Sequence, residues 1–148
     1  MSPDLPPAQQ LTRRLIDYGR ALGASGPYSG YPAAAALDRL YLDLARWVGF
    51  DGCHALFTRA FSEARVEHSL LESIELRPRS TPYIEGVVET AEKHGARETD
   101  QALAASLVIL IEVLGRLIGD EMATILIERG LPQSADDDTS RESWRAEA

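Results

Sequence analysis

The longest apolar stretch of the chain lies between Ala102 and Leu131 and has the composition of a helix. As far as Asp120, only Glu112, Arg116 and Asp120 place charges on its apolar surface, and their spacing of four residues puts them on one line of that helix. A helix that is apolar on nearly every other side has to be surrounded by protein. We expect burial rather than a membrane crossing, because Glu112 and Arg116 would lie near the middle of a bilayer.

An amphipathic helix is predicted over residues 7–22, opened by Pro6 and Pro7 and ended by Gly23. The apolar residues of one face are Leu11, Leu15, Tyr18 and Leu22. Residues 23–32 are rich in Gly, Ser and Pro, which predicts a flexible linker. Because a short helix takes most of its stability from packing, this face is a candidate interaction face. It can dock on its own bundle or on a second copy, and we expect the second arrangement, a homodimer.

The next two helices are predicted on either side of Gly49. Residues 33–48 carry apolar side chains at helical spacing: Leu37, Leu40, Tyr41, Leu44 and Val48. Beyond Asp51, expected to cap the second helix, the apolar stripe consists of Cys53, Leu56, Phe57, Ala60, Phe61 and Ala64. Gly49 supplies the left-handed backbone position that ends the first helix. The two helices therefore form a hairpin or a corner.

The helical period is lost between Ser69 and Ser80, where we expect an extended connection with weak strand character. A further helix follows, with Thr81 as its cap and Pro82 at its first position, and it ends at Gly95. Together these elements predict an all-α fold, a compact bundle of about five helices.

The long apolar helix is expected to begin at a cap formed by Thr99 or Asp100 and to end at Gly130. The last sixteen residues are polar and acidic apart from Trp144, which predicts a disordered tail that folding does not need. The expected organisation is an N-terminal helix with its linker in residues 1–32, a helical core in 33–132 and the tail in 133–148.

Two parts of the chain match without gaps when one is shifted by seventy residues. The match joins Arg46 with Arg116 and Gly49 with Gly119. It also pairs Leu37, Leu40, Leu44, Val48, Asp51, Leu56, Phe57 and Arg59 with Leu107, Leu110, Leu114, Ile118, Glu121, Leu126, Ile127 and Arg129. A duplication predicts two helix-Gly-helix units around a pseudo-twofold axis, although helices rich in Ala and Leu also match through shared composition. In a duplication Gly119 breaks or bends the long helix, and Asp120 caps its second segment.

The stretch from Leu37 to Pro132 resembles a group of short bacterial all-helical proteins. The resemblance is carried above all by RWVGFDGCHALFTRAF and GRLIGDEMATILIERGLP, which share a glycine, an acidic residue and a leucine on a helical background. It implies the helical fold and no particular activity.

With 148 residues the chain suits one domain with its own core, and its formal net charge is -8. An acidic surface repels phosphates, so we expect neither nucleic acid nor a membrane surface as a partner. The N-terminal residues lack the basic start and apolar segment of a signal peptide, which predicts a cytoplasmic location. The single cysteine, Cys53, lies in an apolar stripe and is predicted to be a core residue.

No set of residues has the spacing of a catalytic or metal site. The histidines, His54, His68 and His94, form no ligand pattern. Glu63 and Glu67 stand near His68 but would need distant ligands to hold a metal. Cys53 and His54 are sequence neighbours that point apart. We therefore expect no enzyme, no cofactor and no metal.

A compact helical core without catalytic residues favours a non-enzymatic protein-interaction or regulatory module. One alternative is a small-molecule sensor with an interhelical apolar pocket, lined by Tyr41, Trp47, Phe50, Phe57, Phe61 and Tyr83. Another is a helix-turn-helix DNA-binding protein, in which His54, Thr58, Arg59 and Arg65 face the DNA. The acidity of the chain, and Asp51 at the start of the recognition helix, oppose DNA binding.

Overall fold

The computed structural model describes residues 7–22, 28–80 and 82–131. Its elements are α1 (Pro7–Leu22), α2 (Pro32–Glu67), a 3-10 turn (Ser69–Ser73), β1 (Glu75–Leu76), β2 (Ile84–Glu85), α3 (Val87–His94), α4 (Ala96–Ile118) and α5 (Asp120–Arg129). The predicted all-α bundle of five helices is confirmed for this part of the chain. The tail predicted for residues 133–148 lies outside it.

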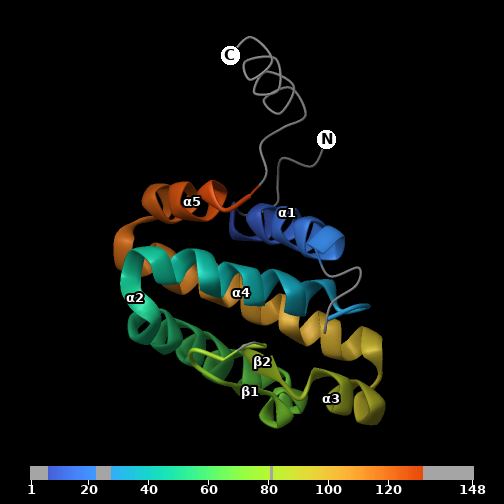
Figure 1. Ribbon diagram of the computed structural model, residues 1–148. Helices are drawn as coiled ribbons and strands as arrows, with labels where there is room; N and C mark the ends of the chain where they lie inside the picture. Colours follow the sequence, from blue (N-terminus) through green and yellow to red (C-terminus); the bar gives the residue numbers. More distant parts are fainter. Residues whose placement is uncertain (1–6, 23–27, 81, 132–148) are drawn as a thin grey trace.

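The first arm of α2, residues 32–48, and helix α4 form the centre of the bundle. They lie side by side and run in the same direction (Figure 1). Beyond Gly49 the second arm of α2, residues 50–67, returns along one side. Beyond Gly119, α5 returns along the opposite side, next to α1. The two strands and α3 lie on the side of the second arm (Figure 1).

Gly49 and Gly119 give the two joints nearly the same backbone shape. Their φ and ψ angles are 81° and 160° for Gly49, and 92° and 146° for Gly119. Side chains disfavour this region and glycine does not. The predicted break at Gly119 is confirmed, although Asp120 is the first residue of α5 rather than its cap.

The seventy-residue match is also a match of burial. The paired leucines Leu37, Leu40, Leu44, Leu107, Leu110 and Leu114 are each at most 1% exposed. Beyond the joints, Cys53 and Phe57 are buried, and so are their counterparts Ala123 and Ile127. Each unit is therefore a helix, a left-handed glycine and a second helix, with the same positions facing the core.

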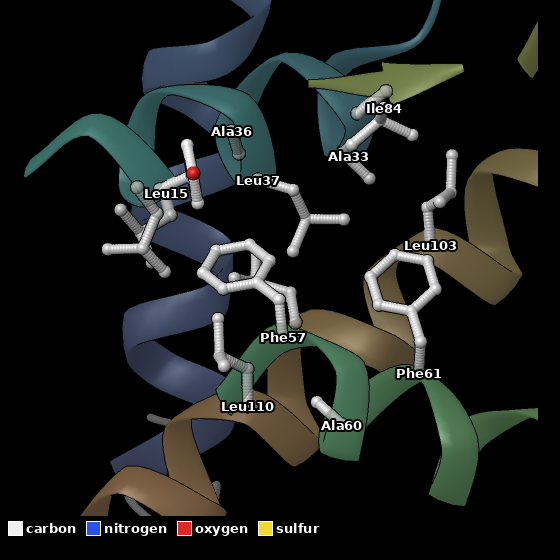
Figure 2. Close-up of a cluster of buried hydrophobic side chains, with 14 of the residues drawn as sticks. Leu15, Ala33, Ala36, Leu37, Phe57, Ala60, Phe61, Ile84, Leu103 and Leu110 are labelled. Atoms are coloured by element: carbon white, nitrogen blue, oxygen red, sulfur yellow. The ribbon is translucent and has the colours of Figure 1, made fainter. Parts of the chain in front are cut away.

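The core lies between the two arms of α2 and α4. Figure 2 shows the side chains that meet there: Phe57 and Phe61 from the second arm, Leu37 from the first, and Leu103 and Leu110 from α4. Leu15 of α1 and Ile84 of β2 add to the same cluster. Helix α5 adds Ala123 and Ile127, so all five helices contribute buried side chains to one core with α4 at its centre.

Helix α1 packs on the first arm of α2 and on α4 of its own chain. At Gly19 the backbones of α1 and α2 come close together. A Cβ added there would lie 2.5 Å from the carbonyl oxygen of Pro32 and 2.8 Å from the backbone nitrogen of Ala36. In the middle of α1, Arg14 forms an ion pair with Glu128 of α5 at 2.6 Å.

The extended connection predicted after Ser69 is a 3-10 turn followed by an antiparallel hairpin, so the predicted strand character is confirmed. In the hairpin Glu75 lies opposite Glu85, and Leu76 opposite Ile84. The helix predicted from Pro82 begins only at Val87, and that prediction of its start is wrong. Its predicted cap, Thr81, lies outside the described residues.

Long-range hydrogen bonds explain why residues 83 and 84 are extended. The backbone N–H of Tyr83 donates to the Asp38 carboxylate at 3.0 Å, and the N–H of Ile84 donates to the Tyr28 hydroxyl oxygen at 3.1 Å. Tyr28 comes from the segment predicted as a linker and is only 6% exposed. Partners distant in sequence therefore override the local helical spacing of these two residues.

Helix α4 begins at Ala96, directly after Gly95, about one turn before either of the predicted caps. The prediction that Thr99 or Asp100 caps this helix is therefore wrong. Gly95 has φ 96° and ψ 143°, close to the angles of the other two joints. A third left-handed glycine thus starts α4 without a side-chain cap.

Among the described residues, α4 is the one helix whose length and hydropathy would allow it to cross a membrane. In this structure it is packed against α1, α2, α3 and α5. Its inward residues Leu103, Leu107 and Leu110 are at most 1% exposed. The inward face of α4 therefore holds the other helices, and 44% of its most apolar window is buried in the bundle.

Candidate functional site

Large apolar side chains gather on the surface at the end of the bundle where both glycine joints lie. We call this surface the joint patch: Trp47, Val48, Leu117, Ile118, Met122 and Ile125, which are 40–59% exposed. Exposed apolar residues scattered singly are ordinary on a protein surface. A group of six at one end of a small bundle is unusual, which makes this surface the candidate binding surface of the described residues.

One half of the joint patch is hollow. A groove of about 370 Å³ lies between the second arm of α2 and the C-terminal end of α4. It is lined by Val48, Gly52, Ala55, Leu56, Arg59, Leu114, Leu117 and Ile118. Small-molecule sites of this size hold a few converging polar groups that orient the ligand. Here Arg59 is the one polar side chain of the lining, so the groove suits an apolar or aromatic side chain better.

The other half of the patch carries larger side chains. The shift of seventy residues carries Gly52 onto Met122, Ala55 onto Ile125 and Leu117 onto Trp47. Small side chains therefore form the groove in one unit, and larger ones form a ridge at the same positions of the other. We call Trp47, Met122 and Ile125 the ridge; they are 53%, 48% and 42% exposed.

An arginine stands at equivalent positions beside both halves. The guanidinium carbon of Arg129 lies 5.0 Å from the centre of the Trp47 ring, within the range of a cation–π contact. Its counterpart Arg59 lines the groove near Leu117 and forms an ion pair with Glu63 at 3.4 Å. The groove therefore has an arginine equivalent to the one beside the ridge, but its lining contains no aromatic ring.

Charges of both signs surround the patch. Arg46 and Arg116 occupy equivalent positions before the two joints, and Asp51 and Glu121 occupy equivalent positions after them; all four are exposed. This balance contrasts with the net charge of -8 of the whole chain. The surroundings of the patch do not select a strongly charged partner.

The interaction face predicted on the first helix is used inside the chain. Leu11 and Leu15 are each 4% exposed, and Tyr18 packs half-buried against the core. Leu22 ends α1, and its side chain lies outside the described residues. With α1 packed on the bundle of its own chain, its apolar face is covered. The joint patch, by contrast, stays exposed.

The aromatic residues considered for a ligand pocket pack on one another instead. Tyr41 and Tyr83 stack with ring centres 3.6 Å apart, and Phe57 meets them edge-on at 5.6 and 5.4 Å. Phe61 is fully buried, while Trp47 and Phe50 lie at the surface. None of the six lines the groove.

The residues considered for DNA contact are partly engaged within the chain. Nδ1 of His54 lies 2.9 Å from the Tyr83 hydroxyl oxygen. Arg65 donates to the carbonyl oxygens of Leu71 and Ile74, both at 3.4 Å. These bonds hold the second arm of α2 against the 3-10 turn and the hairpin, and they explain both side chains without DNA.

Cys53 is fully buried, which confirms its predicted place in the core. Its thiol donates to the carbonyl oxygen of Tyr41 at 3.4 Å, and burial raises the pKa of the thiol to about 12. A thiol that stays protonated at neutral pH is a poor nucleophile. Across residues 7–22, 28–80 and 82–131, no group of three His, Cys, Asp or Glu side chains is placed to hold a metal.

A smaller hollow of about 160 Å³ lies between α1, α4 and α5. Its two carboxylates, Glu112 and Asp120, belong to the predicted line of charges on the long helix and are both exposed. The rest of its lining is Ala8, Leu11, Ile111, Ala123 and Thr124. Two exposed carboxylates against apolar walls do not make a binding site.

Sequence reasoning did not single out the joint patch, although a signal for it exists. Trp47 and Val48 stand immediately before one joint glycine, and Leu117 and Ile118 before the other. Counted against the buried stripes, Trp47 and Leu117 fall outside them, where a polar residue would be expected. Large apolar residues at such positions are a signal of an exposed contact surface.

Comparison with known proteins adds no family to this description. No protein-family model, no curated protein and no solved structure matches the chain. The joint patch therefore stands on the geometry of this chain alone.

Proposed function

We propose that the protein is a non-enzymatic, regulatory interaction module that acts as a homodimer through the joint patch. The observation that supports this function is the group of six large, 40–59% exposed apolar side chains around the two joints. Fully burying one such side chain is worth about 1.5–3 kcal/mol relative to leaving it in water. Covering the patch therefore supplies a driving force that the isolated chain does not use.

Charge and symmetry favour a second copy as the partner. The residues around the patch carry balanced charges, so two identical patches do not repel each other locally. A contact between identical surfaces is closed by a twofold axis and stops at the dimer. The patch has two related halves, a groove and a ridge, which such an axis can bring together.

The mass of the full chain in solution tests this proposal. Sedimentation or light scattering should give a dimer at about 100 µM that dissociates on dilution. Leu117→Glu places a charge in the middle of the patch, at a side chain that is 59% exposed, and should give a monomer that is still folded. Val88→Glu makes the same kind of change at a 45% exposed valine of α3 and should leave the dimer intact.

Two results would contradict the proposal. A full chain that stays monomeric at about 100 µM leaves the patch without a partner copy. A Leu117→Glu chain that keeps the dimer mass points instead to exchange of α1 between copies, through Leu11 and Leu15. Helical circular dichroism of each variant confirms that the fold is retained.

A further inference from the structure

The groove and the ridge arise from the same positions of the two units, where one unit has small side chains and the other has large ones. Gly52 and Ala55 are the residues that leave room in the groove, because their counterparts Met122 and Ile125 stand out on the ridge. Leu117, which lines the groove, corresponds to the larger Trp47. A feature that fills the groove is therefore already present on this chain.

The approximate twofold relation between the units decides how a second copy could use these shapes. Figure 1 shows the first arm of α2 and α4 running in the same direction, with the second arm of α2 and α5 on opposite sides of them. A twofold relation between the two units therefore has its axis along the two central helices, and this axis leaves the bundle at the end where the two joints lie. Groove and ridge thus lie on opposite sides of this axis. A second copy, turned over about a true twofold axis in the plane of the patch, places its ridge on the groove and its groove on the ridge.

We propose that in the homodimer the ridge of each copy, led by Trp47, occupies the groove of the other copy beside Arg59. This inference rests on the proposed function and specifies its interface. Arg129 already lies over one side of the Trp47 ring within the chain. Arg59 stands at the equivalent place beside the groove, so an entering indole meets a second cation as well as Leu56 and Leu117.

The charges around the patch fit the same arrangement. Arg46 and Arg116 are related by the repeat, and so are Asp51 and Glu121, so that each joint has one exposed arginine before it and one exposed carboxylate after it. Both copies therefore bring charges of both signs to the interface, and the patch carries no excess of one sign that would repel a second copy.

Two measurements separate this interface from homodimerisation as such. The chain has two tryptophans, so Trp144→Phe leaves Trp47 as the one fluorescent indole. In that background we expect the emission of Trp47 to shift to shorter wavelength with rising concentration, along the same curve as the mass. The double substitution Gly52→Met with Ala55→Ile gives the groove the residues of the ridge and should raise the dimer dissociation constant at least about tenfold.

Both substituted positions are exposed and helical, and Gly52→Met replaces a poor helix former, so the fold should persist. Val88→Met on α3 is the matched control and should leave the dissociation constant unchanged. Thermal unfolding and circular dichroism of the three chains verify that a change in mass does not come from a change in fold.

Each outcome decides one of the two ideas. A dimer that survives filling of the groove, or that forms without a shift of Trp47 emission, overturns this interface and leaves the homodimer standing. A chain that is monomeric at about 100 µM overturns both. A Trp47 shift that appears only with phosphatidylglycerol vesicles, at unchanged protein mass in their absence, assigns the patch to a lipid surface and also overturns both.

Discussion

The carboxylate of Asp100, in the second turn of α4, accepts a hydrogen bond from the backbone N–H of Ala33 at 3.1 Å. Ala33 is the second residue of α2, and its N–H has no partner within that helix. A side chain of α4 therefore accepts one of the free N–H groups at the N-terminus of α2. The two central helices of the repeat are thereby held in register at the end opposite the joint patch.

Burial makes Asp100 sensitive to pH. Desolvation raises the pKa of its carboxyl above 3.8, against the opposing effects of the Ala33 N–H and of Arg20. A raised pKa in the folded state means that stability falls as pH rises from the ordinary value through the raised one. Asp100→Asn keeps an acceptor oxygen without the charge and should remove this part of the pH dependence.

Urea unfolding at several pH values measures the effect. The stability of Asp100→Asn relative to the natural chain should increase as pH rises through that window. Asp100→Ala removes the acceptor and should cost about 1 kcal/mol at neutral pH. Equal losses for the two variants would show that the charge itself, rather than the acceptor, holds α2.

The two joint glycines should each resist substitution for the same reason. A Cβ at Gly49 or Gly119 meets no atom within 4 Å, so the cost of Gly→Ala comes from the backbone alone. Positive φ with an extended ψ is a region that essentially only glycine adopts, and it should cost alanine about 1–3 kcal/mol. Gly52→Ala is the control, because Gly52 is helical and its added Cβ would make an ordinary 3.8 Å contact with Val48. It should be neutral or stabilising by up to about 1 kcal/mol. Three equal denaturation midpoints would contradict this account of the joints.

The central position of α4 predicts a large effect at Leu110. Leu110→Ala opens a cavity at a side chain that is 1% exposed, and the free energy of unfolding should fall by about 2–5 kcal/mol. Leu42→Ala removes the same atoms from a side chain that is 46% exposed and should cost less than about 1 kcal/mol. A loss below about half a kcal/mol at Leu110 would mean that α4 is not the centre of the core.

Two buried threonines should tolerate loss of their hydroxyls. Within the described residues, the hydroxyl oxygens of Thr90 and Thr99 are buried without a hydrogen-bond partner. Thr→Val keeps the shape and removes an unsatisfied group, so each change should stabilise the protein by up to about 1 kcal/mol. Ser106→Ala is the contrast, since it removes a hydroxyl that donates to the Ala102 carbonyl at 3.1 Å. A loss at Thr90 or Thr99 equal to that at Ser106 would reveal a partner in solution.

Salt should strengthen the association of two copies. Each chain carries a net charge of -8, and an apolar interface gains nothing from that charge. Raising the ionic strength from about 0.01 to 0.15 M shortens the screening length from about 30 to 8 Å and weakens the repulsion between copies. The dimer dissociation constant should therefore fall with salt. A rise with salt would indicate an interface held mainly by ion pairs.

Local rules were sufficient for much of the bundle. The range of α1, the joints at Gly49 and Gly119 and the buried leucines follow from helical spacing and from the freedom of glycine to adopt a positive φ. These features depend on residues within a few positions of one another. The seventy-residue match added a prediction about the tertiary structure. Because the two segments share one pattern, equivalent positions were expected to face the core in both.

Contacts between distant residues decided the rest. Tyr83 and Ile84 have helical spacing, yet hydrogen bonds to Asp38 and Tyr28 draw them into a hairpin. Asp100 was predicted to cap α4, yet its carboxylate accepts a hydrogen bond from the N-terminal backbone of α2. The sequence by itself determined most of the helical segments and the bends at Gly49 and Gly119, since those depend on local free energies. Only the tertiary structure decided that Gly52 and Ala55 of one unit would open a groove beside the ridge of the other, because that surface exists only once the two units pack together.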